Sequence, residues 1–268
     1  MLFERHLVVV RGGGDLASGT VYQFHRAGFP VIVLELERSL AIRRAVSFAT
    51  TVDEGSIVIE GVKAVLAASP DEAARLAADG TVAVLVSPSL PTLRAAPAVV
   101  VDARMAKTNV DTRIDQAPLV VALGPGFEAG VDCDVVIETK RGHRLGRTIR
   151  KGSAQPDTGV PGEVGGHTAK RVVRAPVAGV VDWKLSIGDT VESGQTLGTV
   201  GGSEVFASVG GVVRGLISNE YDVSEGLKIG DVDPRGDRSA CFEISDKARL
   251  VGAGVVGAAF DWLNGVER

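Results

Sequence analysis

The first half of the chain alternates short apolar runs with polar and glycine-rich turns. The runs are continuous rather than alternating, which is typical of parallel strands buried on both faces. Helical patterns follow several of them, around residues 16–27 and 70–78 and in a polar stretch at 39–44. This pattern predicts an α/β domain over residues 1–150 built on a Rossmann-like parallel sheet. The expected strands are residues 7–10, 31–34, 82–86, 99–101, 119–123 and 135–137, with 57–59 and 62–66 as further short strands or a hairpin.

The second half contains an internal repeat. When residues 175–200 are aligned with residues 207–232, ten of the 26 positions are identical at a constant offset of 32. Each copy has the pattern of strand, turn and strand, so two interleaved copies can bury a face that neither copy could bury alone. We therefore expect a mainly β domain over residues 151–245. Residues 246–268 are expected to form a C-terminal helix that packs across a domain or subunit interface, with a homo-oligomer as one consequence.

Composition narrows the classes of function. The 268-residue chain is 45% hydrophobic but only 4% aromatic, and its 34 glycines indicate many turns. A net charge of −4 with scattered basic residues argues against a nucleic-acid partner. Two isolated cysteines predict neither a disulfide framework nor a metal site. No leader or membrane span is evident, so a cytoplasmic location without membrane association is the expectation.

A glycine-rich turn follows the first expected strand. Gly12, Gly13 and Gly14 precede Asp15 and a helix, which approximates the fingerprint of dinucleotide-binding turns. Glycines allow backbone N–H groups to approach a phosphate, and the helix N-terminus adds partial positive charge. Glu35, at the end of the second strand, is placed where a ribose ligand is expected. The alternative is a tight turn without a ligand.

Two further segments follow strand ends, where ligands of open α/β sheets collect. Asp102 precedes Arg104 and Lys107, which would share one helix face and could clamp a phosphate. The alternative is a solvated helix start that Asp102 caps. A second glycine turn contains Gly124 and Gly126.

A basic tract lies just before the expected domain boundary. Arg141, His143, Arg144 and Lys151 could bind an acidic cofactor in a cleft between the domains. His143 and Lys107 are the candidates for a catalytic acid or base, and an inert surface histidine is the alternative. No known nucleophile triad, zinc-protease or Walker motif is present.

Residues 175–181 and 187–197 resemble the start of a biotinyl/lipoyl-type barrel-sandwich hybrid. In carrier members of that family, the hairpin between the half-motifs presents a modified lysine. Here the corresponding stretch, residues 201–205, contains no lysine. The resemblance therefore implies a scaffold or binding version of the module.

Four segments in this order resemble the YqeB family of selenium-dependent molybdenum hydroxylase system proteins. They are residues 11–19, 123–127, 137–146 and 158–162. The resemblance implies an accessory protein that matures molybdenum hydroxylases, with such an enzyme as client and a phosphate-bearing ligand such as a nucleotide or a molybdopterin-type cofactor. It carries over no catalytic residue. An NAD(P)-dependent oxidoreductase and a non-catalytic scaffold protein are the alternatives.

Overall fold

The computed structural model describes residues 1–157 and 170–265, in two units. Unit 1 contains Met1–Ser39, Ser47–Asp157 and Ile244–Arg268, whereas unit 2 contains Leu40–Val46 and Thr158–Glu243. The sequence placed a boundary after residue 150, and unit 1 extends to Asp157. Residues 158–162, which contribute to the YqeB resemblance, and His167 lie outside the described residues.

A nine-stranded mixed sheet forms the centre of the described part of unit 1, in the order β3-β4-β5-β2-β1-β6-β7-β8-β9. The edge strands β3 and β9 are antiparallel to their neighbours, and all strands between them run parallel. The parallel strands expected from the continuous apolar runs are therefore confirmed. The strands are β1 (Val8–Arg11), β2 (Val31–Glu35), β3 (Ser56–Ile59), β4 (Val62–Ala67), β5 (Val82–Val86), β6 (Val99–Asp102), β7 (Leu119–Leu123), β8 (Val135–Ile137) and β9 (Thr148–Ile149).

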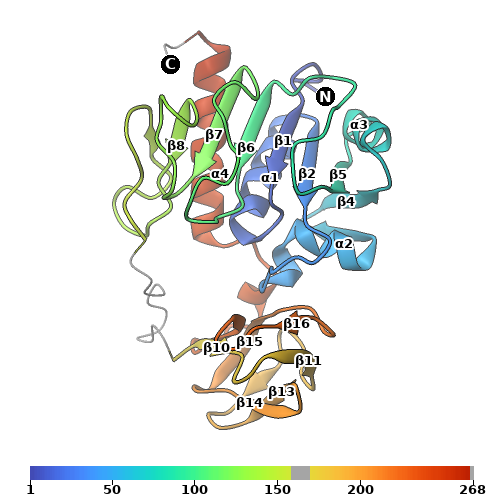
Figure 1. Cartoon of the computed structure of the whole chain (residues 1–268), viewed down its shortest axis with the longest axis vertical. Coiled ribbons are helices and arrows are strands. Elements are labelled where there is room, and N and C mark those ends of the chain that lie inside the picture. Colours follow the sequence, from blue (N-terminus) through green and yellow to red (C-terminus); the bar gives the residue numbers. More distant parts are fainter. Residues whose placement is uncertain (158–169, 266–268) are drawn as a thin grey trace. The chain divides into compact units, whose positions relative to one another are not determined.

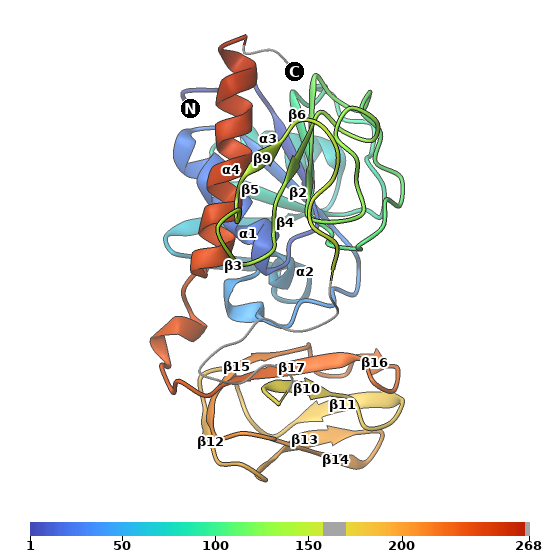
Figure 2. The same ribbon diagram turned by 90° about the vertical axis from the view of Figure 1, so that its left-hand side faces the viewer.

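Two long helices, α1 (Asp15–Ala27) and α4 (Asp246–Leu263), lie side by side along this sheet (Figure 1, Figure 2). Their backbones approach closely, because a Cβ at Gly19 would lie 2.1 Å from the Ala248 carbonyl oxygen. The C-terminal helix thus packs within unit 1. Two shorter helices, α2 (Thr51–Glu54) and α3 (Pro70–Ala78), complete the described helices of this unit. Apolar residues of α3 join Val9 and Ile32 in a buried cluster.

The predicted helix around residues 39–44 is wrong. The segment Leu40–Val46, here termed the strap, belongs to unit 2 and contains only the short 3₁₀ turn η1 (Arg44–Val46). Arg44 donates to the Leu216 carbonyl at 3.0 Å and to the Ser218 hydroxyl at 3.4 Å. Gly215 allows the strap to lie close, because a Cβ there would be 2.8 Å from the carbonyl oxygen of Ile42. Arg44, which made the segment look like an exposed polar helix, instead holds the strap against the residues of unit 2.

Unit 2 contains two four-stranded antiparallel sheets among its described residues, ordered β10-β17-β15-β12 and β14-β13-β11-β16. The two copies of the repeat interleave as expected, since β12 of the first copy pairs with β15 of the second, and β16 pairs with β11. A shared apolar core lies between them. The strands are β10 (Val172–Arg174), β11 (Gly179–Trp183), β12 (Thr190–Val191), β13 (Thr196–Val200), β14 (Ser203–Phe206), β15 (Gly211–Leu216), β16 (Asp222–Val223) and β17 (Lys228–Asp233).

None of the helices in the described ranges has the length and apolar character that crossing a membrane requires.

Candidate functional site

The carboxyl edge of the unit 1 sheet brings most of the sequence-predicted site residues together. Because β1, β2, β6, β7 and β8 run parallel, their carboxyl ends meet at one edge. The chain leaves β1 toward β2 and later returns to β6 on the other side of β1, so the strand order reverses between β1 and β6. Open α/β sheets bind ligands at such a switch point. The residues placed there are Gly12, Gly13, Gly14, Glu35, Asp102, Gly124 and Glu138.

Two glycines of the first turn serve packing. A Cβ at Gly12 would lie 3.1 Å from the backbone of Arg104, and one at Gly13 would lie 2.7 Å from the amide nitrogen of Ala49. The Gly13 N–H donates to Glu35 Oε2 at 2.7 Å, and the Gly13 carbonyl accepts from the Ala49 N–H at 2.9 Å. The buried Glu35 carboxylate therefore holds the turn itself, rather than pointing to a free position for a ribose.

Gly14 differs from both of its neighbours. Its φ of −69° is open to any residue, and among the described residues a Cβ there would meet no atom within 4 Å beyond the adjoining residues. It is the N-cap of α1, and no described side chain caps that helix end. The N-cap position, at the positive end of the helix dipole, therefore adjoins open space within the described part of the chain, which suits an anion.

An ionic network that is buried at Arg11 and Asp102 and exposed at Asp111 joins the ends of β1 and β6 to the following loop. Arg11, only 1% exposed, donates to both oxygens of Asp111 at 2.7 Å. Arg104 bonds Asp102 at 2.5 Å and Asp111 at 2.7 Å, and the Thr112 hydroxyl donates to Asp102 at 2.5 Å. The hydrogen bond from Arg11 lowers the pKa of Asp111, with Arg104 acting in the same direction while burial opposes it. Burial disfavours the charge of Arg104, but its bonds to Asp102 and Asp111 raise its pKa.

The shared helix face predicted for Arg104 and Lys107 is wrong. The described residues 103–118, between β6 and β7, form no helix, and Met105 and Lys107 adopt left-handed backbone conformations, with φ of 57° and 66°. Arg104 turns back onto Asp102, whereas the Lys107 amine pairs with Asp157 at 2.6 Å. The two cations therefore serve separate carboxylates. Asp102 accepts the Arg104 N–H at 3.1 Å and caps no helix.

The second glycine turn is filled by protein atoms. A Cβ at Gly124 would lie 2.6 Å from the Thr139 hydroxyl, and one at Gly126 would lie 2.5 Å from the backbone carbonyl carbon of Lys107. Both glycines therefore admit neighbouring loops. Their spacing gave no sign of this, because it resembles that of a ligand-binding turn.

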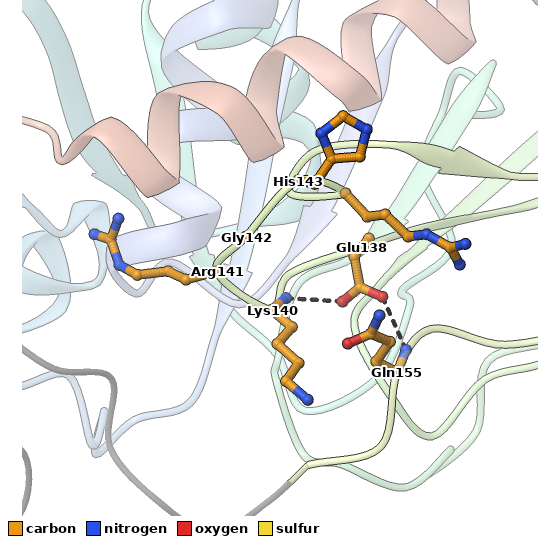
Figure 3. A pocket seen from close by; sticks show the side chains of 7 residues that line it. Glu138, Lys140, Arg141, Gly142, His143 and Gln155 are labelled. Atoms are coloured by element: carbon orange, nitrogen blue, oxygen red, sulfur yellow. Dashed lines mark hydrogen bonds between the residues drawn. The ribbon is translucent and has the colours of Figure 1, made fainter.

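A polar pocket of about 230 Å³ lies after β8, and unit 1 residues alone line it (Figure 3). The Glu138 carboxylate holds two backbone segments of the pocket together, because it accepts hydrogen bonds from the N–H groups of Lys140 at 2.7 Å and Gln155 at 2.8 Å. Arg141 pairs with Asp246 at 2.7 Å, and in Figure 3 it extends away from Lys140. The predicted basic tract is thus present as an exposed rim. The lining residues are Glu138, Lys140, Arg141, Gly142, His143, Arg144 and Gln155.

Lys247 was missed by the sequence analysis. It lies in the first turn of α4 and is partly buried. Burial lowers the pKa of its amine and Arg141 adds to this effect, whereas Asp15, Glu138 and Asp246 oppose it. Its two sequence neighbours contact other parts of this edge, since Asp246 pairs with Arg141 of the pocket and Ala248 packs against Gly19 of α1. Only the packing of α4 on α1 brings it there, and its sequence neighbours carry no motif.

The described residues contain neither a candidate metal site nor a reactive thiol. No group of three or more His, Cys, Asp or Glu residues there could hold a metal ion. Cys133 is buried, and desolvation together with nearby Asp132 and Asp134 raises the pKa of its thiol to about 12.

Comparison with known proteins finds no matching family model. Two solved structures give weak likenesses. The first is a succinylglutamate desuccinylase/aspartoacylase from Rhodobacter sphaeroides, which is 22% identical over 24% of this chain and 22% of that chain, with a TM-score of 0.23. The second is an aspartoacylase family protein from Mesorhizobium loti, which is 12% identical over 85% of this chain and 84% of that chain, with a TM-score of 0.29. Both scores are too low to indicate a shared fold.

One curated relative is similar over almost the whole chain. The uncharacterized protein YqeB of Escherichia coli (strain K12) is 48% identical over 253 residues, which cover 94% of this chain and 47% of that protein. The chain therefore spans about half the length of the curated relative it matches. This similarity supports the resemblance to YqeB that the sequence motifs indicated.

Proposed function

We propose that the carboxyl edge of the unit 1 sheet binds a phosphate-bearing small molecule at the N-terminus of α1. One observation carries the proposal. Within the described part of the chain, Gly14 faces open space at a helix end that no side chain caps, although Gly12 and Gly13 beside it are packed against protein. Backbone N–H groups at such an end form an anion site.

The charges around this position are of both signs. Asp15, in the first turn of α1, opposes a phosphate, whereas Lys247, on which Asp15 acts electrostatically, favours one. Arg11 and Arg104 both pair with Asp111, which keeps this edge rigid. These ion pairs leave the N–H groups at the start of α1 available to a ligand. Rigid backbone donors are effective because they need no reordering when the ligand binds.

A nucleotide or a molybdopterin-type cofactor is the proposed ligand class, in a Rossmann-like domain. The accessory role in maturing molybdenum hydroxylases rests on the family resemblance, and the proposed barrel-sandwich unit would dock the client. An NAD(P)-dependent oxidoreductase is a weaker candidate, because Glu35 is engaged by Gly13 rather than free for a ribose. We therefore favour ligand binding over hydride transfer.

Calorimetry with CTP, GTP, NAD(H) and NADP(H) tests the proposal, with Gly14→Val as the critical variant. The valine fills the space that the ligand needs, so binding is expected to be lost while the protein stays folded. Gly257→Val is the matched control, because Gly257 in α4 also faces open space. Equal affinity in the wild type and Gly14→Val would refute the site.

A further inference from the structure

A second group of cations lies beside the proposed phosphate position. Lys140 and Arg144 line the pocket after β8, and Lys247 follows Asp246 of α4, which pairs with Arg141 of the pocket. Within residues 1–157 and 170–265, the side chains of these three cations form no hydrogen bond or ion pair. Arg141, by contrast, pairs with Asp246, and Glu138 is engaged by two backbone N–H groups.

The parallel packing of α1 and α4 sets the position of Lys247. Gly19 and Gly252 let the two backbones touch, and Ala248, next to Lys247, packs against Gly19 in the second turn of α1. Asp246, on the other side of Lys247 in the sequence, pairs with Arg141 of the pocket at 2.7 Å. The first turn of α4 therefore connects the helix α1 with the pocket.

A partly buried ammonium without an acceptor is costly, and an anion that binds it recovers that cost. We propose that the ligand carries two linked acidic groups, and that Lys247, with Lys140 and Arg144, binds the second group. This inference rests on the proposed function, since the first group is the phosphate at Gly14. Burial, which lowers the pKa of Lys247, supports it, because an anion at the pocket restores the charged form.

Inorganic phosphate and tripolyphosphate are the probes for this second subsite. The wild type is expected to bind tripolyphosphate more tightly than phosphate. Lys247→Met should weaken tripolyphosphate binding by about tenfold to a hundredfold, as expected for a lost charged hydrogen bond, and should weaken phosphate binding much less. Lys247→Arg should retain the preference. Lys63→Met, which changes an exposed lysine of β4, is the control for general charge.

The outcomes separate this inference from the proposed function. If Gly14→Val abolishes binding of both probes but Lys247→Met keeps the full preference for tripolyphosphate, the second subsite is wrong and the first stands. If Gly14→Val leaves phosphate binding intact, the proposed function is wrong. A wild type without preference for tripolyphosphate, or an equal loss in Lys63→Met, also overturns the subsite. Thermal unfolding of each variant checks that the fold is intact.

Discussion

The two glycine turns at the carboxyl edge look alike in sequence and differ in space. The turn after β7 is packed with protein, since a Cβ at Gly124 or Gly126 would overlap its neighbours. In the turn after β1, Gly14 opens onto free space and an uncapped helix. A glycine-rich turn therefore shows that other atoms can come close to its backbone. Whether those atoms belong to the protein or to a ligand depends on the surrounding structure.

Gly126→Ala tests the packed turn and should have the largest effect. The alanine meets the Lys107 backbone and holds a φ of 104°, so we expect a loss of about 2–4 kcal/mol in the free energy of unfolding. Urea denaturation measures it. Gly130→Ala is the control, because its φ of 88° has a similar backbone cost but its surroundings are open. Equal losses in the two variants would show that the turn is not tightly packed.

Acid titration tests the network that fixes the base of the open turn. Arg11 lowers the pKa of Asp111 below its usual 3.8, so their pairing contributes stability above that value. The contribution is lost as the pH falls through the lower pKa of the folded state. Denaturation between about pH 6 and pH 2 should therefore show a steeper loss in the wild type than in Asp111→Asn. Parallel curves would mean that Asp111 is not held by Arg11.

Gly14→Ala tests the open turn itself. Its φ is ordinary and nothing obstructs a methyl group, so the free energy of unfolding should change by less than about 1 kcal/mol. A helix N-cap prefers glycine to alanine, whereas alanine restricts the unfolded chain, and these effects oppose each other. A loss as large as that of Gly126→Ala would remove the contrast between the turns.

Thiol labelling gives the smallest expected signal. Cys133 packs with Phe127 and Ala129 beside the second turn, and its pKa of about 12 leaves almost no thiolate at pH 8. Burial also raises the pKa of Cys241. A disulfide reagent should therefore label the native protein very slowly. Faster labelling of Gly126→Ala than of Gly130→Ala would tie this protection to the packed turn, and rapid wild-type labelling would contradict the packing.

The sequence predicted those elements whose pattern is local. The apolar runs located β1 and β7, and the 32-residue offset predicted equivalent strands such as β11 and β15, which start 32 residues apart. Tertiary contacts decided the rest. The residues of the strap read as a polar helix, although Arg44 has its acceptors in β15 and just beyond it.

The candidate site was predictable as a region and not as a set of contacts. Parallel strands place Gly14 and Asp102 at one edge whatever their side chains do. Sequence spacing does not show that Glu35 bonds Gly13, nor that Arg104 folds back onto Asp102. Lys247 reaches this edge because Gly19 of α1 and Gly252 of α4 let the two helices pack closely. These glycines are far apart in the sequence, so no local pattern indicates their contact.

The strap also determines how the chain can be divided. It emerges early in synthesis, but the acceptor of its Arg44 at Leu216 follows 172 residues later. During translation, the early segment must therefore wait for the last third of the protein before its contacts can form, and closing so long a loop delays completion of unit 2. A fragment cut before residue 158 would carry the strap without its sheet. The complementary fragment would keep the sheet and lack Arg44, so mixing the two pieces would measure how much of unit 2 depends on this crossing.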